Sequence, residues 1–432
     1  MIFFIIILLC TGFIALFYII NKSNNKKNHR IQTETSPAIR NNPVDIGLMY
    51  FNGDGVSQNY KQALEYFEKA AASGYAQGIL YKAIIYYEGL GVKADIEKAF
   101  ELFENAAQKG NTKAMMILGQ IYMDAQIVEQ NYQKANEYFL MAARQGEGEA
   151  LFNLGLIYLD GKGVDKDYSK ARVYFEQAAQ KGNMEAKTNL AFIYMNGQGV
   201  SRDLEKAREY FELSANQGDR KAEYNLALMY WNGEGGEKNT NKARGYFEKA
   251  AYQDDVEAQY FVANLYFTGN TVELDYKRAF SFYNKAAMQG YVKAQFMLGQ
   301  MYEEGKGVLQ NIDKAVYWYE QAADQNDMNA QYNLGYLYLT GKTSRINLQK
   351  AYDYFKKAAE QGYVLAQFNL GVMYYKGDGV IQDNHKAAAW FQKAADQNHK
   401  KSQLILGKMY LEGRGIPHDH QKGMELIRLS ET

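Results

Sequence analysis

The sequence of 432 residues is poor in cysteine, in proline and in net charge, and each shortage excludes a class of protein. The single cysteine, Cys10, lies in an apolar N-terminal run, so the rest of the chain can form neither a disulfide nor a thiolate metal site. Lysine plus arginine equals aspartate plus glutamate at 49 each, which leaves no net positive field to attract nucleic acid. Only three prolines accompany 38 glycines and 37 tyrosines, a balance typical of many short helices with glycine at their ends.

Motifs of enzyme chemistry are also missing. There is no H-E-x-x-H, no C-x-x-C and no nucleophile elbow, and the five histidines are His29, His385, His399, His418 and His420. The segment His418-Asp-His420 carries metal-ligand side chains, but its charged terminal setting favours a solvated turn. Glycine pairs such as Gly161 and Gly163 lack the strand that precedes a phosphate loop. We therefore predict that the protein is not an enzyme and uses no cofactor, metal ion or small-molecule substrate.

A run of nineteen uncharged and mostly apolar residues, 2–20, begins directly after Met1. As a helix, this run nearly spans a hydrocarbon core of roughly 30 Å. It lacks the basic start and the small residues at a cleavage site that mark a signal peptide, so residues 1–20 are predicted to be an uncleaved transmembrane anchor. A lipoprotein modified at Cys10 is the alternative, and the bulky Ile7, Leu8 and Leu9 before the cysteine disfavour it.

The residues after this run predict how the chain is placed at the membrane. Residues 21–42 are polar and contain almost no aromatic residues, which is typical of a flexible linker. Lys22, Lys26, Lys27 and Arg30 follow the apolar run, and no charged side chain precedes it. By the positive-inside tendency the remainder is cytoplasmic, with a periplasmic location as the alternative. A C-terminal reporter that is active only outside the cytoplasm would overturn the first placement.

The rest of the chain, residues 43–432, repeats with a period of 36 residues and without a single insertion. One column of the repeat is invariant tyrosine: Tyr50, Tyr86, Tyr122, Tyr158, Tyr194, Tyr230, Tyr266, Tyr302, Tyr338, Tyr374 and Tyr410. Two further columns are alanine, beginning at Ala63 and Ala71. This register predicts about eleven copies of one structural unit.

The fourth copy shows what the unit is. Apolar residues from Ala150 to Tyr158 recur with helical spacing, two glycines interrupt the pattern, and helical spacing resumes from Ala171 until Gly182. Each copy is therefore a first helix, a turn and a second helix, which we name helix A and helix B. A column of glycine or alanine in helix A, such as Gly155, stands opposite a column of Phe or Tyr in helix B, such as Phe175, which predicts packing of large against small residues.

A few copies depart from the pattern. Ala125 and Ile127 in the third turn, Thr271 in the seventh and Thr343 in the ninth replace the usual glycines, so we expect these turns to deform while the repeat continues. In the last copy, a shorter and more polar second helix around residues 421–429 is predicted to cap the array, with Gly423 and Ile427 in its core columns.

The pattern A-x-x-N-L-G-x-x-Y-x-x-G-x-G-V-x-x-D-x-x-K-A-x-x-Y-F-x-x-A-A-x-x-G, from Ala150 to Gly182, resembles the Sel-one-like repeat family of tetratricopeptide-like solenoids. The resemblance covers about residues 43–429. It implies an all-α, right-handed superhelix of antiparallel helix pairs that serves as a scaffold or adaptor for protein partners. Members of this family include bacterial envelope, signalling and host-interaction proteins. The cysteine count excludes its disulfide-linked branch.

Candidate binding residues lie in helix A, which lines the concave surface of related solenoids. One column carries Asn153, Asn189, Asn225, Asn333 and Asn369. Amide side chains can hold a peptide backbone or a terminal carboxylate, so a peptide clamped along this ladder is one interpretation, and a structural role within the repeat is the other. The neighbouring aromatic column is more typical of core: Tyr224, Tyr260, Phe296, Tyr332 and Phe368. Packing is also the interpretation for Trp231, Trp318 and Trp390, with Trp231 the weakest case.

Taken together, these features predict a membrane-tethered scaffold, of bacterial type, that binds a protein or peptide partner on the solenoid surface. One alternative is an assembly or structural factor of the cell envelope, with the solenoid outside the cytoplasm. Another is a stoichiometric, immunity-type inhibitor of a partner enzyme.

Overall fold

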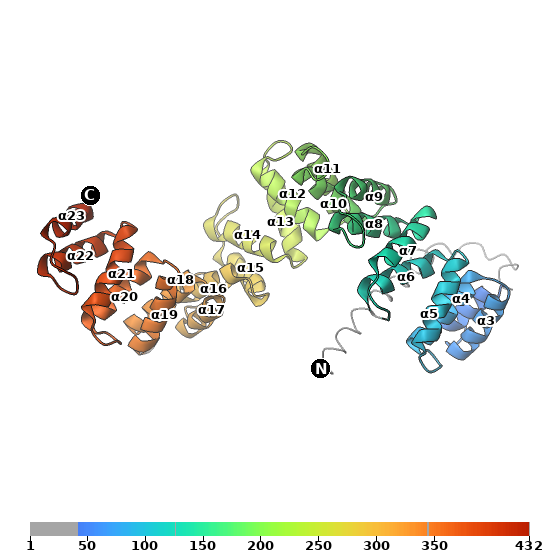
Figure 1. Cartoon of the computed structure of the whole chain (residues 1–432), viewed down its shortest axis with the longest axis horizontal. Helices are drawn as coiled ribbons and strands as arrows, with labels where there is room; N and C mark the ends of the chain where they lie inside the picture. Colours follow the sequence, from blue (N-terminus) through green and yellow to red (C-terminus); the bar gives the residue numbers. More distant parts are fainter. Residues whose placement is uncertain (1–41, 126, 344, 432) are drawn as a thin grey trace. The chain divides into compact units, whose positions relative to one another are not determined.

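The computed structural model describes residues 42–125, 127–343 and 345–431, and these residues form 22 helices and no strands. The chain divides into two compact units, residues 1–219 and 220–432. In the first unit the helices form five A–B pairs (Figure 1). Their bounds are α2 Pro43–Asn52, α3 Tyr60–Ala72, α4 Ala76–Glu88, α5 Ile96–Gln108, α6 Thr112–Asp124, α7 Tyr132–Arg144, α8 Gly148–Asp160, α9 Tyr168–Gln180, α10 Met184–Asn196 and α11 Leu204–Ala215.

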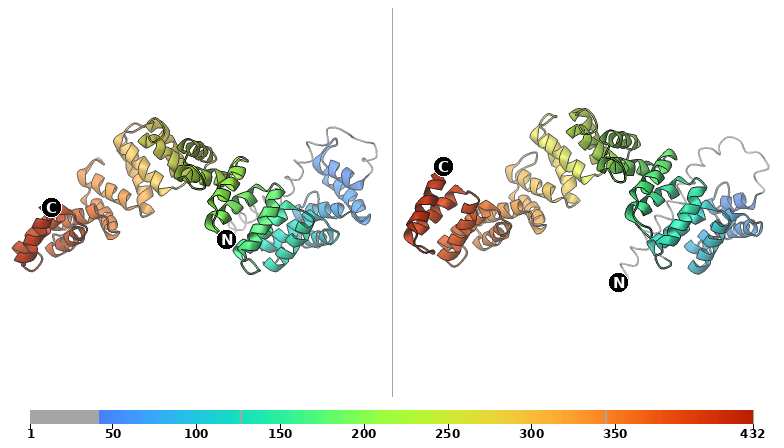
Figure 2. Two further views of the ribbon diagram at one scale, coloured as in Figure 1. Left: turned by 90° about the horizontal axis from the view of Figure 1, so that it is seen from above. Right: turned by 45° about the horizontal axis from the view of Figure 1, so that its top comes forward.

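The second unit continues the same alternation with six A–B pairs. Within each unit every B helix contacts the A helix before it and the next A helix along that unit. Figure 2 shows the succession of helices from two further sides. The bounds are α12 Arg220–Asn232, α13 Thr240–Tyr252, α14 Val256–Thr268, α15 Tyr276–Met288, α16 Val292–Glu304, α17 Ile312–Asp324, α18 Met328–Thr340, α19 Leu348–Glu360, α20 Val364–Lys376, α21 Asn384–Asp396, α22 Lys400–Glu412 and α23 His420–Glu431. The predicted repeat of paired helices is confirmed.

Glycine at the C-terminal end of helix A and Asp or Asn at the N-terminal end of helix B cap the helices. Gly161 follows α8 in the left-handed conformation, with φ of 74°, and its N–H donates to the carbonyl of Ile157. Six residues later the carboxylate of Asp167 accepts from the N–H of Lys170 at 2.9 Å and caps α9. The N–H of Asp167 donates to the carbonyl of Tyr158 at 2.9 Å, which closes the turn between the two helices. Asp or Asn caps nearly every B helix in the same way.

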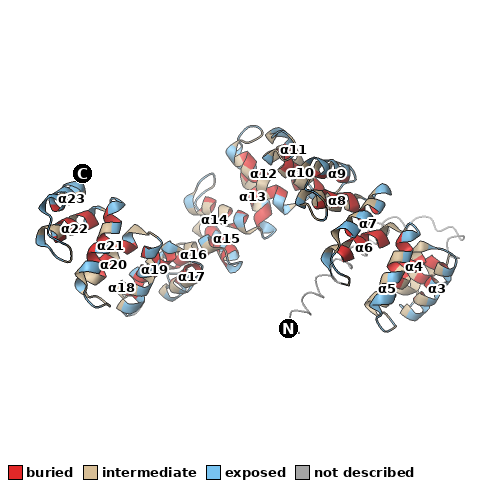
Figure 3. Ribbon diagram, in the orientation of Figure 1, coloured by how far each residue is buried: buried red, intermediate tan, exposed pale blue. Residues whose placement is uncertain are grey.

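The core lies along the seam between paired helices, as the distribution of buried residues shows (Figure 3). Phe175 is fully buried, and its ring occupies the space where a side chain at Gly155 would lie. The same pairing recurs at Gly119 and Phe139, where an added Cβ would come within 2.6 Å of the ring. The predicted packing of large against small residues is confirmed. The glycine of each such helix A packs against the ring of helix B in the same repeat.

The invariant tyrosine has a recurrent environment of its own. Tyr158 stacks on Tyr174 with ring centroids 5.6 Å apart, and the Lys170 ammonium lies 5.2 Å from the centroid of the Tyr158 ring. Equivalent stacks with a cation occur in most repeats. This environment gives a reason for the lysine that precedes the first conserved alanine of helix B.

The expectation that turns without glycine deform is wrong in the seventh turn, and in the third turn it stays a prediction. Ala125 and Thr271 keep left-handed backbones with φ of 55° and 67°. A left-handed residue with a side chain costs about 1–2 kcal/mol, which the contacts on either side of the turn can outweigh. One such contact is the Arg244 guanidinium, which donates to the carbonyl of Thr271 at 3.3 Å.

The last helix of the chain, α23 His420–Glu431, pairs with α22. The predicted last helix is present as α23, in which Gly423 and Leu426 are buried and Ile427 lies against Gly407, and its role as a cap stays a prediction. Sequence reasoning missed Leu426. The predicted anchor, residues 1–20, and all of the predicted linker except Asn42 lie outside the described residues. No helix in the described part of the chain is both long and apolar enough to cross a bilayer.

Candidate functional site

The aromatic column of helix A is half-buried, where core had been expected. Each ring packs with one side against the bulky residue of its own B helix; Tyr332 lies 5.8 Å from Phe355, and Phe368 lies 6.0 Å from Phe391, between ring centroids. The other side of Tyr332 and of Phe368 lines a cavity in the second unit. The column therefore serves the core and a surface at once.

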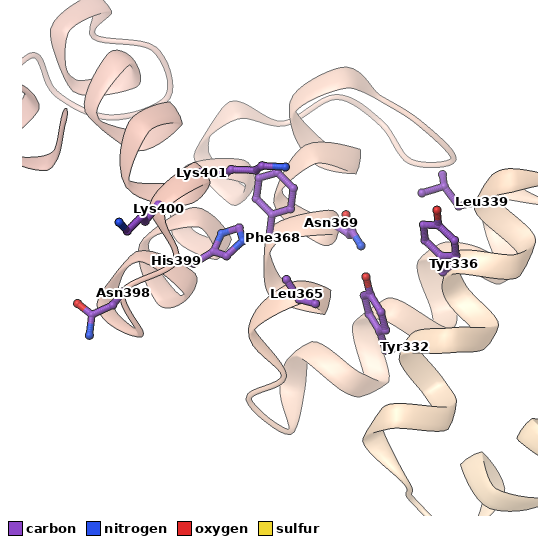
Figure 4. A pocket seen from close by; sticks show the side chains of 10 residues that line it. All are labelled: Tyr332, Tyr336, Leu339, Leu365, Phe368, Asn369, Asn398, His399, Lys400 and Lys401. Carbon is purple, nitrogen blue, oxygen red and sulfur yellow. The ribbon is translucent and has the colours of Figure 1, made fainter. Parts of the chain in front are cut away.

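This cavity, of about 540 Å³, lies over α18, α20 and the start of α22 (Figure 4). Its apolar wall consists of Tyr332, Tyr336, Leu339, Leu365 and Phe368. Its polar wall consists of Asn369, Asn398, His399, Lys400 and Lys401. Aromatic faces beside amide and ammonium donors suit a ligand that carries apolar groups and hydrogen-bond acceptors.

A second cavity of about 310 Å³ adjoins the first and shares Tyr332 and Tyr336 with it. It extends onto α16 through Gln300, Glu303 and Glu304, and it includes Asn333. The two cavities meet at Tyr332 and Tyr336 and together lie over the A helices α16, α18 and α20 and the start of α22; we name the pair of them the helix-A groove. Tyr336, at 42% exposure, lies at its centre.

The two ends of the helix-A groove differ in charge. At the α16 end, Glu303 pairs with Lys342 at 3.2 Å and Glu304 pairs with Lys306 at 2.6 Å. Glu303 also accepts a hydrogen bond from the hydroxyl of Tyr319 at 3.0 Å, and burial raises the pKa of that hydroxyl. The α22 end has two lysines and no carboxylate in its wall.

The predicted asparagines are half-buried and each lies on a different A helix. The amides of Asn189 and Asn225 donate to carbonyls of their own helices, those of Glu185 and Lys221, both at 2.8 Å. Asn153 lies on α8 and lines neither cavity. In the second unit the column is interrupted by Phe261 and Met297. A continuous five-membered ladder is therefore not formed, and the peptide clamp stays a prediction.

Two of the predicted asparagines do lie in the helix-A groove, on adjacent A helices. Asn333 of α18 lines the second cavity, and Asn369 of α20 lines the first. Asn369 faces the hydroxyl of Tyr332 in Figure 4. Burial raises the pKa of Tyr332, and a hydrogen bond with Asn369 opposes that rise. These two residues keep a candidate role in binding.

A column of buried glutamines in the second unit was missed. Gln295 accepts a hydrogen bond from Gln325 at 2.9 Å and donates to the carbonyl of Ala287 at 3.3 Å, so it links three successive helices. Gln259, Gln331 and Gln367 do the same. The buried glutamines and their partners both repeat every 36 residues, but the 30-residue offset that pairs the two columns is visible only in the packed helices.

His399 joins the wall of the groove to the start of α22. Its Nδ1 accepts from the backbone N–H of Ser402 at 3.3 Å, which caps the helix, and its ring lies 4.8 Å from that of Phe368. Burial, and to a smaller extent the charge of Lys401, lowers the pKa of His399 below 6.5. The neutral ring that can act as the cap acceptor is therefore favoured in the folded state.

The stability of α22 is therefore expected to depend on pH. As the pH falls below 6.5, the unfolded chain takes up a proton at His399 before the folded chain does, so the free energy of unfolding decreases until the folded pKa is reached. Hydrogen exchange of residues 400–412, corrected for intrinsic rates, should show protection falling from pH 7 to pH 5.5. In the matched variant His399→Asn this fall should be smaller, because Asn183 caps α10 in the same way without titrating in this range. An equal fall in both proteins would contradict the assignment.

No group of three or more metal-ligating side chains occurs among the residues that the structure describes. His418 and His420 lie on either side of Asp419, which caps α23 by accepting from the N–H of Lys422 at 2.9 Å. What the groove offers is stacking surface, amide donors and charge, which are means of binding.

The sequence matches the Sel1 repeat family eleven times, at residues 44–75, 83–111, 112–147, 148–183, 185–219, 220–255, 256–291, 292–327, 329–363, 364–399 and 400–430. A protective antigen with an SLR fold from uropathogenic Escherichia coli is 31% identical over 90% of this chain and 87% of its own, with a TM-score of 0.76. A Sel1 repeat protein from Oxalobacter formigenes is 30% identical over 68% of this chain and 86% of its own, with a TM-score of 0.54. None of the curated proteins matches significantly. With eleven matches that cover most of its length, the chain belongs to the Sel1 repeat family.

Proposed function

We propose that the protein is an interaction scaffold and that its helix-A groove holds an extended peptide segment of a partner protein. The observation that carries this proposal is the groove itself, two adjoining cavities centred on Tyr332 and on the exposed Tyr336. Tyrosine supplies a large contact area together with a hydroxyl and is enriched at binding hot spots. Asn333 and Asn369 add amide groups that can pair with a peptide backbone.

The form of the groove favours a peptide over a small molecule. Both cavities are open to solvent, whereas sites for small molecules bury most of the ligand. The groove lies over three successive A helices and reaches the start of a fourth, an arrangement that a peptide in extended conformation can follow from helix to helix.

Selection from a random dodecapeptide display library on the full-length chain in detergent tests the proposal. We expect enriched peptides to bind Tyr336→Ala/Leu365→Ala at least tenfold more weakly than the unchanged protein, because both side chains are exposed in the groove and carry little of the core. Affinity would be measured by fluorescence anisotropy with the synthesised peptides.

The matched control is Tyr317→Ala, which removes a tyrosine that is 53% exposed, against 42% for Tyr336, from helix α17, outside the lining of both cavities. This variant should bind the peptides as the unchanged protein does. If no peptide is enriched, or if the enriched peptides bind both variants alike, the helix-A groove is not the peptide site.

We further propose that residues 2–20 hold the scaffold at a membrane, since the run is long and apolar enough for this. The flanking cations support a cytoplasmic solenoid. The second candidate is an envelope factor with the solenoid outside the cytoplasm, and the similar E. coli protein, a protective antigen, favours it. The location of the C-terminus separates these two candidates.

A further inference from the structure

The α22 end of the helix-A groove has a positive charge that its surroundings do not balance. Lys400 and Lys401 are exposed and line the cavity, whose wall contains no aspartate or glutamate. No carboxylate among the described residues lies within ion-pair distance of either lysine. His399 adds no charge at neutral pH, because burial lowers its pKa. The end of the groove therefore attracts an anion.

The surroundings of Lys401 show what else such an anion must carry. In Figure 4 its side chain lies above the ring of Phe368 and extends in the direction of Asn369. Leu365, at 40% exposure, lines the same cavity. An ammonium group and an amide beside an aromatic and an aliphatic surface suit a carboxylate with an apolar group next to it.

Charge also argues against one occupant from this chain. The linker, residues 21–42, carries Lys22, Lys26, Lys27, Arg30 and Arg40 against the single acidic residue Glu34. Such a segment would be repelled by Lys400 and Lys401. The occupant is therefore expected from a partner protein.

We propose that the segment bound in the helix-A groove is an acidic peptide, with an aspartate or glutamate side chain at Lys401 and an apolar side chain on Phe368 and Leu365. Lys400, whose side chain extends away from Phe368 in Figure 4, adds to the positive charge at this end of the groove. This inference rests on the proposed function and adds the chemistry of the partner. At the α16 end, Glu303 and Glu304 already have lysine partners, so no matching cation on the peptide is required.

The dodecapeptide selection tests this inference when it is repeated on Lys400→Gln/Lys401→Gln. The displayed peptides are joined to their carrier at the C-terminal end, so any carboxylate that is selected is a side chain and not a chain terminus. On the unchanged protein, aspartate and glutamate should be enriched over the input library. On the variant this excess should disappear, while apolar residues stay enriched. Lys408→Gln is the matched control, since Lys408 is exposed on the same helix and does not line the cavity.

The strongest peptide is then synthesised with its acidic residues and with their amide counterparts. For the unchanged protein, the amide form should bind at least tenfold more weakly, and the difference should shrink at high salt. For Lys400→Gln/Lys401→Gln, the two forms should differ less than twofold. Peptides that bind equally in both forms, and still lose affinity in Tyr336→Ala/Leu365→Ala, would overturn the acidic preference and leave the peptide function standing. Loss of all peptide enrichment would refute the proposed function as well.

Discussion

Replacing Phe175 by alanine is expected to destabilise the α8–α9 repeat by about 3–5 kcal/mol, the usual cost of emptying a phenylalanine site in a core. The ring is fully buried, packs 5.8 Å from that of Phe152, and fills the space that Gly155 leaves open. Because Gly155 has no side chain, the surrounding helices have little with which to fill the cavity. Urea unfolding and hydrogen exchange of residues 148–180 would measure the loss.

The position of this repeat inside the first unit should enlarge the effect. Each repeat is stabilised by its neighbours, so a weakened interior repeat also loosens α7 and α10, which pack against it. Exchange should therefore rise in those two helices too. The matched control is Val173→Ala on α9, where the side chain is 41% exposed and the expected change is within about 0.5 kcal/mol. If Phe175→Ala and Val173→Ala lost the same free energy of unfolding, the Phe175 ring would not be what stabilises the packing of α8 on α9.

The pairing of Gly155 with Phe175 could be predicted because it depends on side-chain size at fixed positions in every repeat. The same reasoning did not reveal how tyrosine fits the bulky column at Tyr283 and Tyr319. Their hydroxyls donate to Asn264 at 2.9 Å and to Glu303 at 3.0 Å, which lie at different positions of the repeat. Each polar partner occurs only in the copy that needs it, so the repeat pattern does not show it.

The helix-A groove could not be predicted from the sequence either, because its residues do not stand out in the repeat pattern. Its central residue, Tyr336, occupies a position where other copies have Leu156, Leu228 or Gln300, so no pattern singles it out. Lys401 lies in a column that also has lysine at Lys113, Lys221 and Lys293, so no pattern singles it out either. Residues from several helices become visible as one site only when the helices are placed beside one another. The asparagine column shows the converse, since a regular pattern there includes residues bonded within their own helices.

Replacing a buried glutamine is the second substitution expected to cause a large loss of stability. Gln331 is 1% exposed; its amide donates to the carbonyl of Ala323 at 3.2 Å, and its oxygen accepts from Gln361 at 2.7 Å, so it joins α17, α18 and α19. Gln331→Ala removes both hydrogen bonds and leaves a cavity, which together should cost roughly 2–4 kcal/mol. Hydrogen exchange of residues 328–360 and urea unfolding would measure the loss. Gln349→Ala, an exposed glutamine on α19 that bonds to Asp353, should change little.

Gln331→Met separates the two parts of this cost. Methionine fills nearly the same volume and stands at the equivalent position of α6 as Met115, which is 2% exposed. It restores the packing but not the hydrogen bonds, and Gln361, which is exposed, can bond to water in place of Gln331. We therefore expect Gln331→Met to lose about 1 kcal/mol, half or less of the loss in the alanine variant.

A methionine variant as unstable as the alanine variant would show that the hydrogen bonds, and not the filled volume, hold these helices together. A methionine variant as stable as the unchanged protein would mean that the glutamine network adds nothing to packing. The glutamine network occurs in the second unit, and in that case its role there would not be stability. The next role to test would be the alignment of the helices that form the helix-A groove.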